Sequence, residues 1–143
     1  KFPPYEKILP KGHSTVVKID RGELISALER VDIIVRDYNR MVILELKENE
    51  TLVMRGKAPD LGLAKEEVEA EIKGDSLKIA VNSKFFMEAL KVLRDPYVVL
   101  GFNGPTGQMT VKKVGEESFI CLIAPINMSE EEQNMDTMES SEE

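Results

Sequence analysis

One pattern occurs twice in this chain, first as Lys18-Ile19-Asp20-Arg21-Gly22-Glu23-Leu24-Ile25-Ser26-Ala27-Leu28 and again as Ala80-Val81-Asn82-Ser83-Lys84-Phe85-Phe86-Met87-Glu88-Ala89-Leu90. Each copy reads as a short strand, an Asp or Asn suited to a helix N-cap, and apolar residues at helical spacing. Strand-rich sequence follows both copies. A unit that cannot close its own core packs against its copy, so the pattern predicts a duplicated fold. The alternative is that two ordinary strand-helix units agree by chance.

The segments around the two copies predict the remaining elements. Asp20 is expected to cap a helix that runs to about Val35. Asn82 is expected to cap a second helix that runs to about Leu93, where Asp95-Pro96 ends it. The order β-α-β-β-β occurs twice, which predicts an α+β fold with two helices packed on antiparallel sheets. The strands are expected at residues 15–20, 41–46, 51–56, 67–72, 76–81, 97–102, 108–114 and 118–124.

The composition is that of a soluble globular domain. The chain has 143 residues, of which 42% are hydrophobic and 31% charged, enough for one domain with a real core. No apolar run approaches the ~20 residues that a membrane helix needs. The single cysteine, Cys121, excludes an internal disulfide and is expected to be buried and inert. The first residue is Lys1 and not Met, so we expect the chain to be a piece of something longer.

The net charge of −7 is unevenly distributed. Residues 129–143 hold seven acids and no Lys or Arg, and the other residues hold 19 acids against 19 bases. We therefore expect a folded domain over residues 1–128 that is neutral overall, followed by a disordered acidic tail over residues 129–143. This distribution neither requires nor excludes a surface that faces DNA.

Catalytic and metal-binding motifs are missing from the sequence. His13 is the single histidine and has no cysteine nearby to complete a metal site. The sequence contains no nucleophile elbow, phosphate-binding loop or dinucleotide fingerprint. From Glu67 to Ile72 acids alternate with apolar residues, and a solvated strand explains these acids and the neighbouring Glu66 better than a catalytic pair does. The residues thus give no indication of an enzyme or of a metal site.

Three surface features remain as candidates for binding. Ile33 lies off the apolar stripe of the first helix, so it either marks a contact surface or covers a neighbouring loop. The polar faces of both helices carry Lys and Arg, which either meet phosphates or simply face water. The apolar run 119–126 stands beside the acidic tail, and an edge strand this apolar is either covered or used for binding.

The order of several motifs resembles a known family. Phe2-Pro3-Pro4-Tyr5-Glu6-Lys7-Ile8-Leu9-Pro10 resembles the segment that enters the third domain of the bacterial sliding clamp, the beta subunit of DNA polymerase III. The resemblance continues through Arg21-Gly22-Glu23-Leu24, Val81-Asn82-Ser83-Lys84-Phe85 and Ile123-Ala124-Pro125-Ile126, and covers residues 2–128 in order. In that family each domain is a doubled β-α-β-β-β unit, and three such domains form one subunit.

The resemblance implies a non-catalytic role in DNA replication. Clamp subunits close as a head-to-tail homodimeric ring around double-stranded DNA, which confers processivity on the polymerase. They also dock the polymerase, the clamp loader and repair proteins through short peptides that end in apolar residues. By this resemblance the protein is cytoplasmic and nucleoid-associated, without a membrane partner or a cofactor. The runner-up interpretation is a free-standing protein-binding module of the same fold, with neither ring nor DNA.

The resemblance also assigns residues by position. The dimer contact of the family, at the end of the first helix, matches Ile33 and Ile34. The side chains that would face the duplex without reading its sequence are Arg40, Lys84, Lys91 and Arg94. The partner-peptide pocket combines apolar side chains with polar groups that fix an extended peptide. Its lining would be Pro3, Lys7, Ile8, Asn82, Phe85, Thr106, Gln108, Leu122, Ile123, Ala124, Pro125 and Ile126.

This sequence departs from the family pattern in three places. Lys7 stands where an Arg is usual, so planar bidentate bonding is lost there. Phe85 lacks the aromatic hydroxyl expected near the pocket. Family members usually stop near Met128, whereas this chain adds the acidic tail. That tail is either a solubilising extension or a segment whose Gln133, Met135 and Met138 imitate a clamp-binding peptide.

Overall fold

The computed structural model describes residues 15–47, 50–104, 106–114 and 121–128. Within these ranges two helices and eight strands follow one another in the predicted order, β-α-β-β-β twice. The first unit consists of β1 (Thr15–Asp20), α2 (Arg21–Val35), β2 (Met41–Lys47), β3 (Thr51–Ala58) and β4 (Gly62–Gly74). The second consists of β5 (Leu77–Asn82), α3 (Ser83–Val92), β6 (Tyr97–Phe102), β7 (Met109–Lys113) and β8 (Cys121–Ile123).

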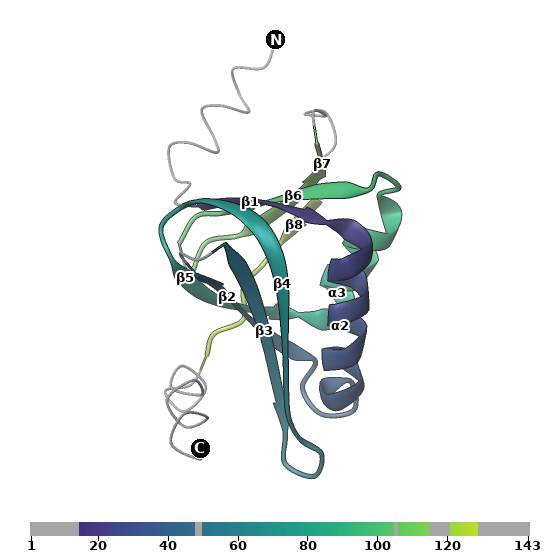
Figure 1. Ribbon diagram of the computed structural model, residues 1–143. Coiled ribbons are helices and arrows are strands. Elements are labelled where there is room, and N and C mark those ends of the chain that lie inside the picture. Colours follow the sequence, from purple (N-terminus) through teal and green to yellow (C-terminus); the bar gives the residue numbers. More distant parts are fainter. Residues whose placement is uncertain (1–14, 48–49, 105, 115–120, 129–143) are drawn as a thin grey trace.

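The strands form one antiparallel sheet in the order β5-β2-β3-β4-β1-β6-β7-β8, with both helices on one side (Figure 1). Strands of the two units pair with each other at two places, because β5 of the second unit pairs with β2 of the first, and β1 pairs both with β4 of its own unit and with β6 of the second. Strand β5 is therefore separated from the other strands of its own unit by the whole first unit. The duplicated α+β architecture predicted from the sequence is confirmed.

Both helices begin at the predicted caps. The Asp20 Oδ1 atom accepts a hydrogen bond from the Glu23 N–H at 2.9 Å. The Asn82 Oδ1 atom accepts from the N–H groups of Lys84 and Phe85 at 2.8 and 3.1 Å. Each cap satisfies backbone donors that have no partner inside the helix, which sets the first residue of each helix.

The two helices run antiparallel and are tied together at both ends. At one end, Arg21 Nε donates to the Leu90 carbonyl at 2.7 Å, and the Arg21 N–H donates to the Pro96 carbonyl at 2.8 Å. At the other end, Ser83 Oγ donates to Asp32 Oδ1 at 2.5 Å. The end of α3 is thus fastened to the start of α2, and the start of α3 to the last turn of α2.

The core lies between the sheet and this helix pair. It includes the predicted stripe of α2, whose members Leu24, Leu28 and Val31 are fully buried. Helix α2 approaches β3 closely at Gly56, where a Cβ atom would stand only 2.7 Å from Val35 Cγ1. Because glycine has no Cβ atom, α2 can pack directly against β3 at this position.

Strand β4 differs from the prediction, because it is 13 residues long and begins at Gly62 instead of residue 67. Residues 62–69 pair with β3, and residues 70–74 pair with β1. One strand therefore serves both halves of the sheet, which short-range sequence patterns do not reveal. Strand β8 spans residues 121–123, and the predicted start of this strand at 118–120 lies outside the described residues. Cys121 is half-buried and not fully buried as expected.

No helix among the described residues is both long and apolar enough to cross a bilayer.

Candidate peptide-docking site

Strand β8 presents two neighbouring apolar side chains to opposite faces of the sheet. Ile123 pairs with Met109, which belongs to the core, and Ile123 itself is 5% exposed. Leu122 pairs with Thr110 and is 62% exposed. Since successive side chains of a strand alternate between faces, Ile123 anchors the strand while Leu122 is presented to solvent.

The segment after β8 crosses to the other edge of the sheet. The Ile126 N–H donates to the Ala80 carbonyl at 2.8 Å, and the two residues form an isolated antiparallel bridge. Ile126 and Met128 pack against Ile43 and Ala80 in a small second apolar cluster. Residues 124–126 therefore connect the edge strands β8 and β5, and Ala124 between them is exposed.

The start of α3 lies at the same place. Ala80 is two residues before Asn82, the cap of α3, and α3 contacts β8 directly. Phe85, in the first turn of α3, is 56% exposed, although large apolar side chains are usually covered. The structure thus presents Phe85 and Leu122 on adjoining elements, as two exposed apolar side chains.

The turn between β6 and β7 contributes two polar residues of the predicted lining. Thr106 and Gln108 are both exposed. Gln108 directly precedes Met109, the partner of Ile123, so it lies at the end of β8. The predicted residues Pro3, Lys7 and Ile8 lie outside the described residues. The other nine predicted lining residues come from three places: the start of α3, the β6–β7 turn and residues 122–126.

The predicted DNA-facing residues separate into two groups. Arg40 and Lys84 lie together, because the Arg40 carbonyl accepts a hydrogen bond from the N–H of Ser83 at 2.8 Å. Arg40 Nη1 is 4.0 Å from Asp32 Oδ1, whereas the Lys84 side chain is exposed. Lys91 and Arg94 are exposed at the other end of α3, about 10 Å along the helix from Lys84.

The predicted dimer-contact residues lie at the end of α2. Ile33 is 54% exposed and Ile34 is half-buried. Two further apolar side chains, Leu61 and Leu63, are 58% and 39% exposed near the turn that joins β3 to β4. Sequence reasoning did not single these leucines out, although two leucines beside a predicted turn are a visible signal.

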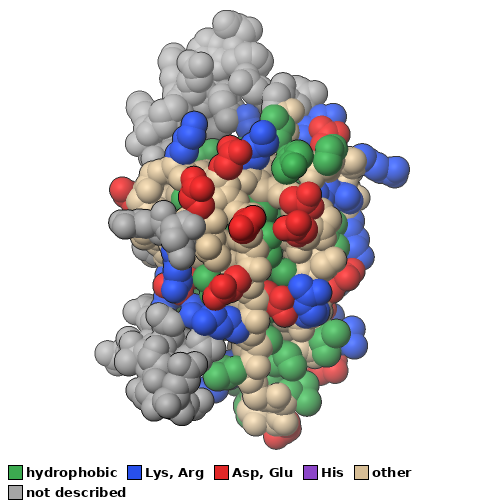
Figure 2. Space-filling view, in the orientation of Figure 1, with side chains coloured by type: hydrophobic (Ala, Val, Ile, Leu, Met, Phe, Trp, Pro, Cys, Tyr) green, Lys and Arg blue, Asp and Glu red, His purple; other side chains and the backbone are tan. Residues whose placement is uncertain are grey.

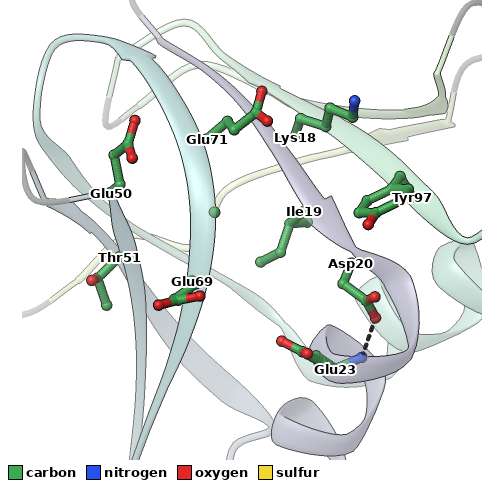
Figure 3. Close-up of a pocket in the computed structure, with 10 residues that line it drawn as sticks. Lys18, Ile19, Asp20, Glu23, Glu50, Thr51, Glu69, Glu71 and Tyr97 are labelled. Carbon is green, nitrogen blue, oxygen red and sulfur yellow. Dashed lines mark hydrogen bonds between the residues drawn. The ribbon is translucent and has the colours of Figure 1, made fainter.

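A polar cleft that sequence reasoning missed opens where β4 diverges from β3 to join β1 (Figure 3). Its volume is about 560 Å³, and Lys18 Nζ lies 5.2 Å from the centre of the Tyr97 ring at its border. Figure 2 shows acidic side chains gathered on this face. The lining residues come from separate strands, so no local sequence motif predicts them. They are Lys18, Ile19, Asp20, Glu23, Glu50, Thr51, Glu69, Ala70, Glu71 and Tyr97.

The acids of β4 behave as the sequence indicated. Glu67, Glu69 and Glu71 are exposed. Glu66 accepts a hydrogen bond from Arg30 Nη2 at 2.9 Å, and this bond raises the pKa of the Arg30 guanidinium, with the Glu66 charge as the second cause. The described residues contain no group of three or more His, Cys, Asp or Glu side chains placed to hold a metal ion.

Comparison with known proteins identifies the family to which this fold belongs. The sequence model of the family described as "DNA polymerase III beta subunit, C-terminal domain" matches residues 6–127. The chain belongs to this family, whose members are non-catalytic.

Individual relatives agree with the family match. The beta sliding clamp of Staphylococcus aureus is 32% identical over 126 residues, which are 87% of this chain and 33% of that protein. The DNA polymerase III beta subunit of Thermotoga maritima superposes with a TM-score of 0.80 at 28% identity, over 90% of this chain and 35% of that one. The corresponding protein of Pseudomonas aeruginosa superposes with a TM-score of 0.78 at 27% identity, over 89% of this chain and 35% of that one. The chain thus spans about a third of the length of these relatives.

Proposed function

We propose that this chain is the C-terminal domain of a replicative DNA sliding clamp, which gives the polymerase processivity by encircling duplex DNA and docking replication and repair proteins. The observation that carries the proposal is the family match over residues 6–127, together with the exposed apolar side chains beside α3 and β8. The protein would act in the cytoplasm, at the nucleoid.

The docking site would take a short extended peptide that ends in apolar residues. Leu122 and Phe85 would receive the apolar side chains, because both are already exposed and lose water on binding. Asn82, Thr106 and Gln108 would hydrogen-bond the peptide backbone, and the remaining lining would come from Pro3, Lys7, Ile8 and residues 123–126. Partner peptides of this class would come from the polymerase, the clamp loader and repair proteins.

DNA would be held by topology and by charge without readout of the sequence. Arg40, Lys84, Lys91 and Arg94 would face the phosphates across a hydrated gap, each contributing weakly. A closed ring retains DNA even when each contact is weak.

The ring would be a homodimer with Ile33 and Ile34 at its contact. Supporting this, Ile33 is the one large apolar side chain of α2 that is exposed, at 54%. Within the described residues, positions 62–69 of β4 pair with β3 alone, so this edge is open to a strand of another domain.

Titration of a fluorescent, apolar-ended peptide from a replicative polymerase tests the docking site. We expect Leu122→Asp to weaken binding at least tenfold, since a carboxylate would replace an apolar contact. Leu61→Asp is the matched control, because Leu61 is 58% exposed but lies at the far β3–β4 turn, and it should bind like the wild type. Equal affinities of the two variants would reject the assignment.

A further inference from the structure

Arg40 has a backbone conformation that its residue type disfavours. Its φ of 53° lies in the left-handed region, where the Cβ atom of an L-residue is crowded against the following carbonyl oxygen. Glycine or asparagine usually takes this conformation after the end of a helix. The Arg40 N–H donates to the Val35 carbonyl at 2.9 Å and so closes the turn after α2. A strained residue of this kind persists only where surrounding contacts hold it.

The side chain of Arg40 supplies such contacts. Its Nε atom donates to the Arg36 carbonyl at 3.3 Å, and its Nη1 atom lies 4.0 Å from Asp32 Oδ1. The planar fork of the guanidinium reaches both groups at once, whereas the ammonium of a lysine is a single point charge. The side chain therefore ties the strained residue back to the end of α2.

The left-handed conformation aims the Arg40 carbonyl at the first residue of α3. The Ser83 N–H donates to this carbonyl at 2.8 Å. The next two N–H groups of α3, those of Lys84 and Phe85, donate to Asn82 Oδ1 at 2.8 and 3.1 Å. These N–H groups have no partner inside the helix, so the bonds to them fix where the helix begins. The start of α3 is thus capped jointly by Asn82 from its own unit and by Arg40 from the other unit.

We propose that Arg40 is a positioning residue of the docking site, which holds the first turn of α3 so that Phe85 and Leu122 together receive a partner peptide. This role rests on the proposed docking function. It differs from a contact with DNA phosphates, because it depends on the backbone conformation of residue 40 and not on its charge. Phe85 is exposed on that first turn, so a shift of the turn moves it relative to Leu122 on β8. A peptide that contacts both side chains is sensitive to such a shift.

Substitutions of Arg40 in the full chain separate conformation from charge. Arg40→Ala removes the guanidinium and leaves a residue that disfavours positive φ, and Arg40→Lys does the same but keeps the charge. Arg40→Gly removes the side chain but adopts positive φ without strain. Arg36→Ala is the matched control, because Arg36 is an exposed arginine of the same turn and its carbonyl is retained. Binding is measured with a fluorescent, apolar-ended peptide, and circular dichroism verifies that each variant is folded.

We expect Arg40→Ala and Arg40→Lys to bind the peptide at least about fivefold more weakly than the wild type, because the unsupported residue leaves the left-handed region. Arg40→Gly and Arg36→Ala should stay within about twofold of the wild type. Wild-type binding by Arg40→Lys would overturn the proposal, since charge alone would then suffice. A Gly variant as weak as the Ala variant, or an equal loss in Arg36→Ala, would also overturn it.

Hydrogen exchange followed by NMR tests the geometry without a peptide. In Arg40→Ala, the Ser83 N–H should exchange at least about tenfold faster, because it loses its acceptor. The N–H of Leu44, in the central strand β2, should keep its protection. Arg40→Gly should restore the protection of Ser83. Equal acceleration of both N–H groups in Arg40→Ala would indicate general destabilisation and would overturn the positioning role.

Leu122→Asp distinguishes this role from the docking function itself. If the wild type binds the peptide and Leu122→Asp does not, the docking site exists, and the Arg40 variants judge the positioning role alone. If the wild type does not bind, the docking function and the positioning role are both wrong.

Discussion

Ser83 Oγ donates a hydrogen bond to Asp32 Oδ1 at 2.5 Å, and this bond joins the first residue of α3 to the last turn of α2. Ser83 is completely buried, and its N–H is bound to the Arg40 carbonyl at 2.8 Å. The helix start that carries Phe85 is therefore held from the neighbouring repeat, at the side chain and at the backbone. The proposed docking residues at this end depend on contact between the two halves of the chain.

Asp32→Ala should destabilise the domain by about 1–3 kcal/mol, because the buried Ser83 hydroxyl loses its acceptor. Urea denaturation followed by circular dichroism measures the change. Asp37→Ala, at an exposed position just beyond α2, is the control and should have little effect. In a double-mutant cycle, Ser83→Ala should recover part of the loss, and strictly additive effects would contradict the pairing.

Gly56→Ala should destabilise the domain by about 1–3 kcal/mol through overpacking against Val31 and Val35. Thermal unfolding of the variant and the wild type measures this loss of stability. Gly22→Ala is the matched control, since its Cβ would be 3.4 Å from Asp20 Oδ1 and a helical alanine is favoured by up to about 1 kcal/mol. Val31→Ala in the Gly56→Ala background should relieve the crowding. A Gly56→Ala protein as stable as wild type would show that α2 lies farther from β3.

Asn82→Ala should cost about 1 kcal/mol of stability, because two N–H groups at the start of α3 lose their acceptor. Asn82→Asp keeps an acceptor at the cap and should restore the stability. Chemical denaturation of the three proteins at neutral pH provides the comparison. If the Ala and Asp variants are equally stable, the cap does not stabilise α3.

Ile33→Asp should convert the complete protein from dimer to monomer, since a charge would replace an apolar contact at the proposed ring interface. Sedimentation velocity reports the oligomeric state. Val92→Asp is the control, because Val92 is 60% exposed on α3 and lies outside the proposed contact. A dimer that persists in Ile33→Asp would move the interface away from the end of α2.

The isolated chain should bind duplex DNA weakly, with a dissociation constant above about 1 μM at physiological salt, because the proposed bases make only nonspecific phosphate contacts. Fluorescence anisotropy titrations with labelled duplex DNA at increasing salt concentrations measure this dissociation constant. Lys84→Glu combined with Lys91→Glu should weaken the residual binding further. Tight, salt-resistant binding by this chain alone would contradict retention by ring topology.

Sequence alone determined the local features of this protein. Asp20 and Asn82 were predicted as helix caps, and the structure confirms both. Caps are predictable from sequence because the side chain bonds to backbone only two or three residues away. The buried stripe of α2 follows from helical periodicity. The duplicated order of elements also follows, because the repeat is a property of the sequence itself.

The candidate site was predictable only in part. Its residues were assigned from a family resemblance, and only the structure shows which of them are exposed. Alternation along a strand places Leu122 and Ile123 on opposite faces of the sheet. The pairing of β8 with β7 then shows which of the two faces is buried. Pro3, Lys7 and Ile8 lie outside the described residues, so their place in the site stays a prediction. The cleft beside Lys18 and Tyr97 was missed because its walls come from strands far apart in sequence.

Tertiary structure decided the remaining features. The pairing of β1 with β6, the pairing of β5 with β2, the double pairing of β4 and the bridge from Ile126 to Ala80 all join residues distant in the chain. Such pairings depend on how the whole apolar surface is buried at once, and a local pattern carries no information about its distant partner. Local hydrogen bonding and periodicity therefore specify the elements, and the burial of a shared core specifies how they are joined.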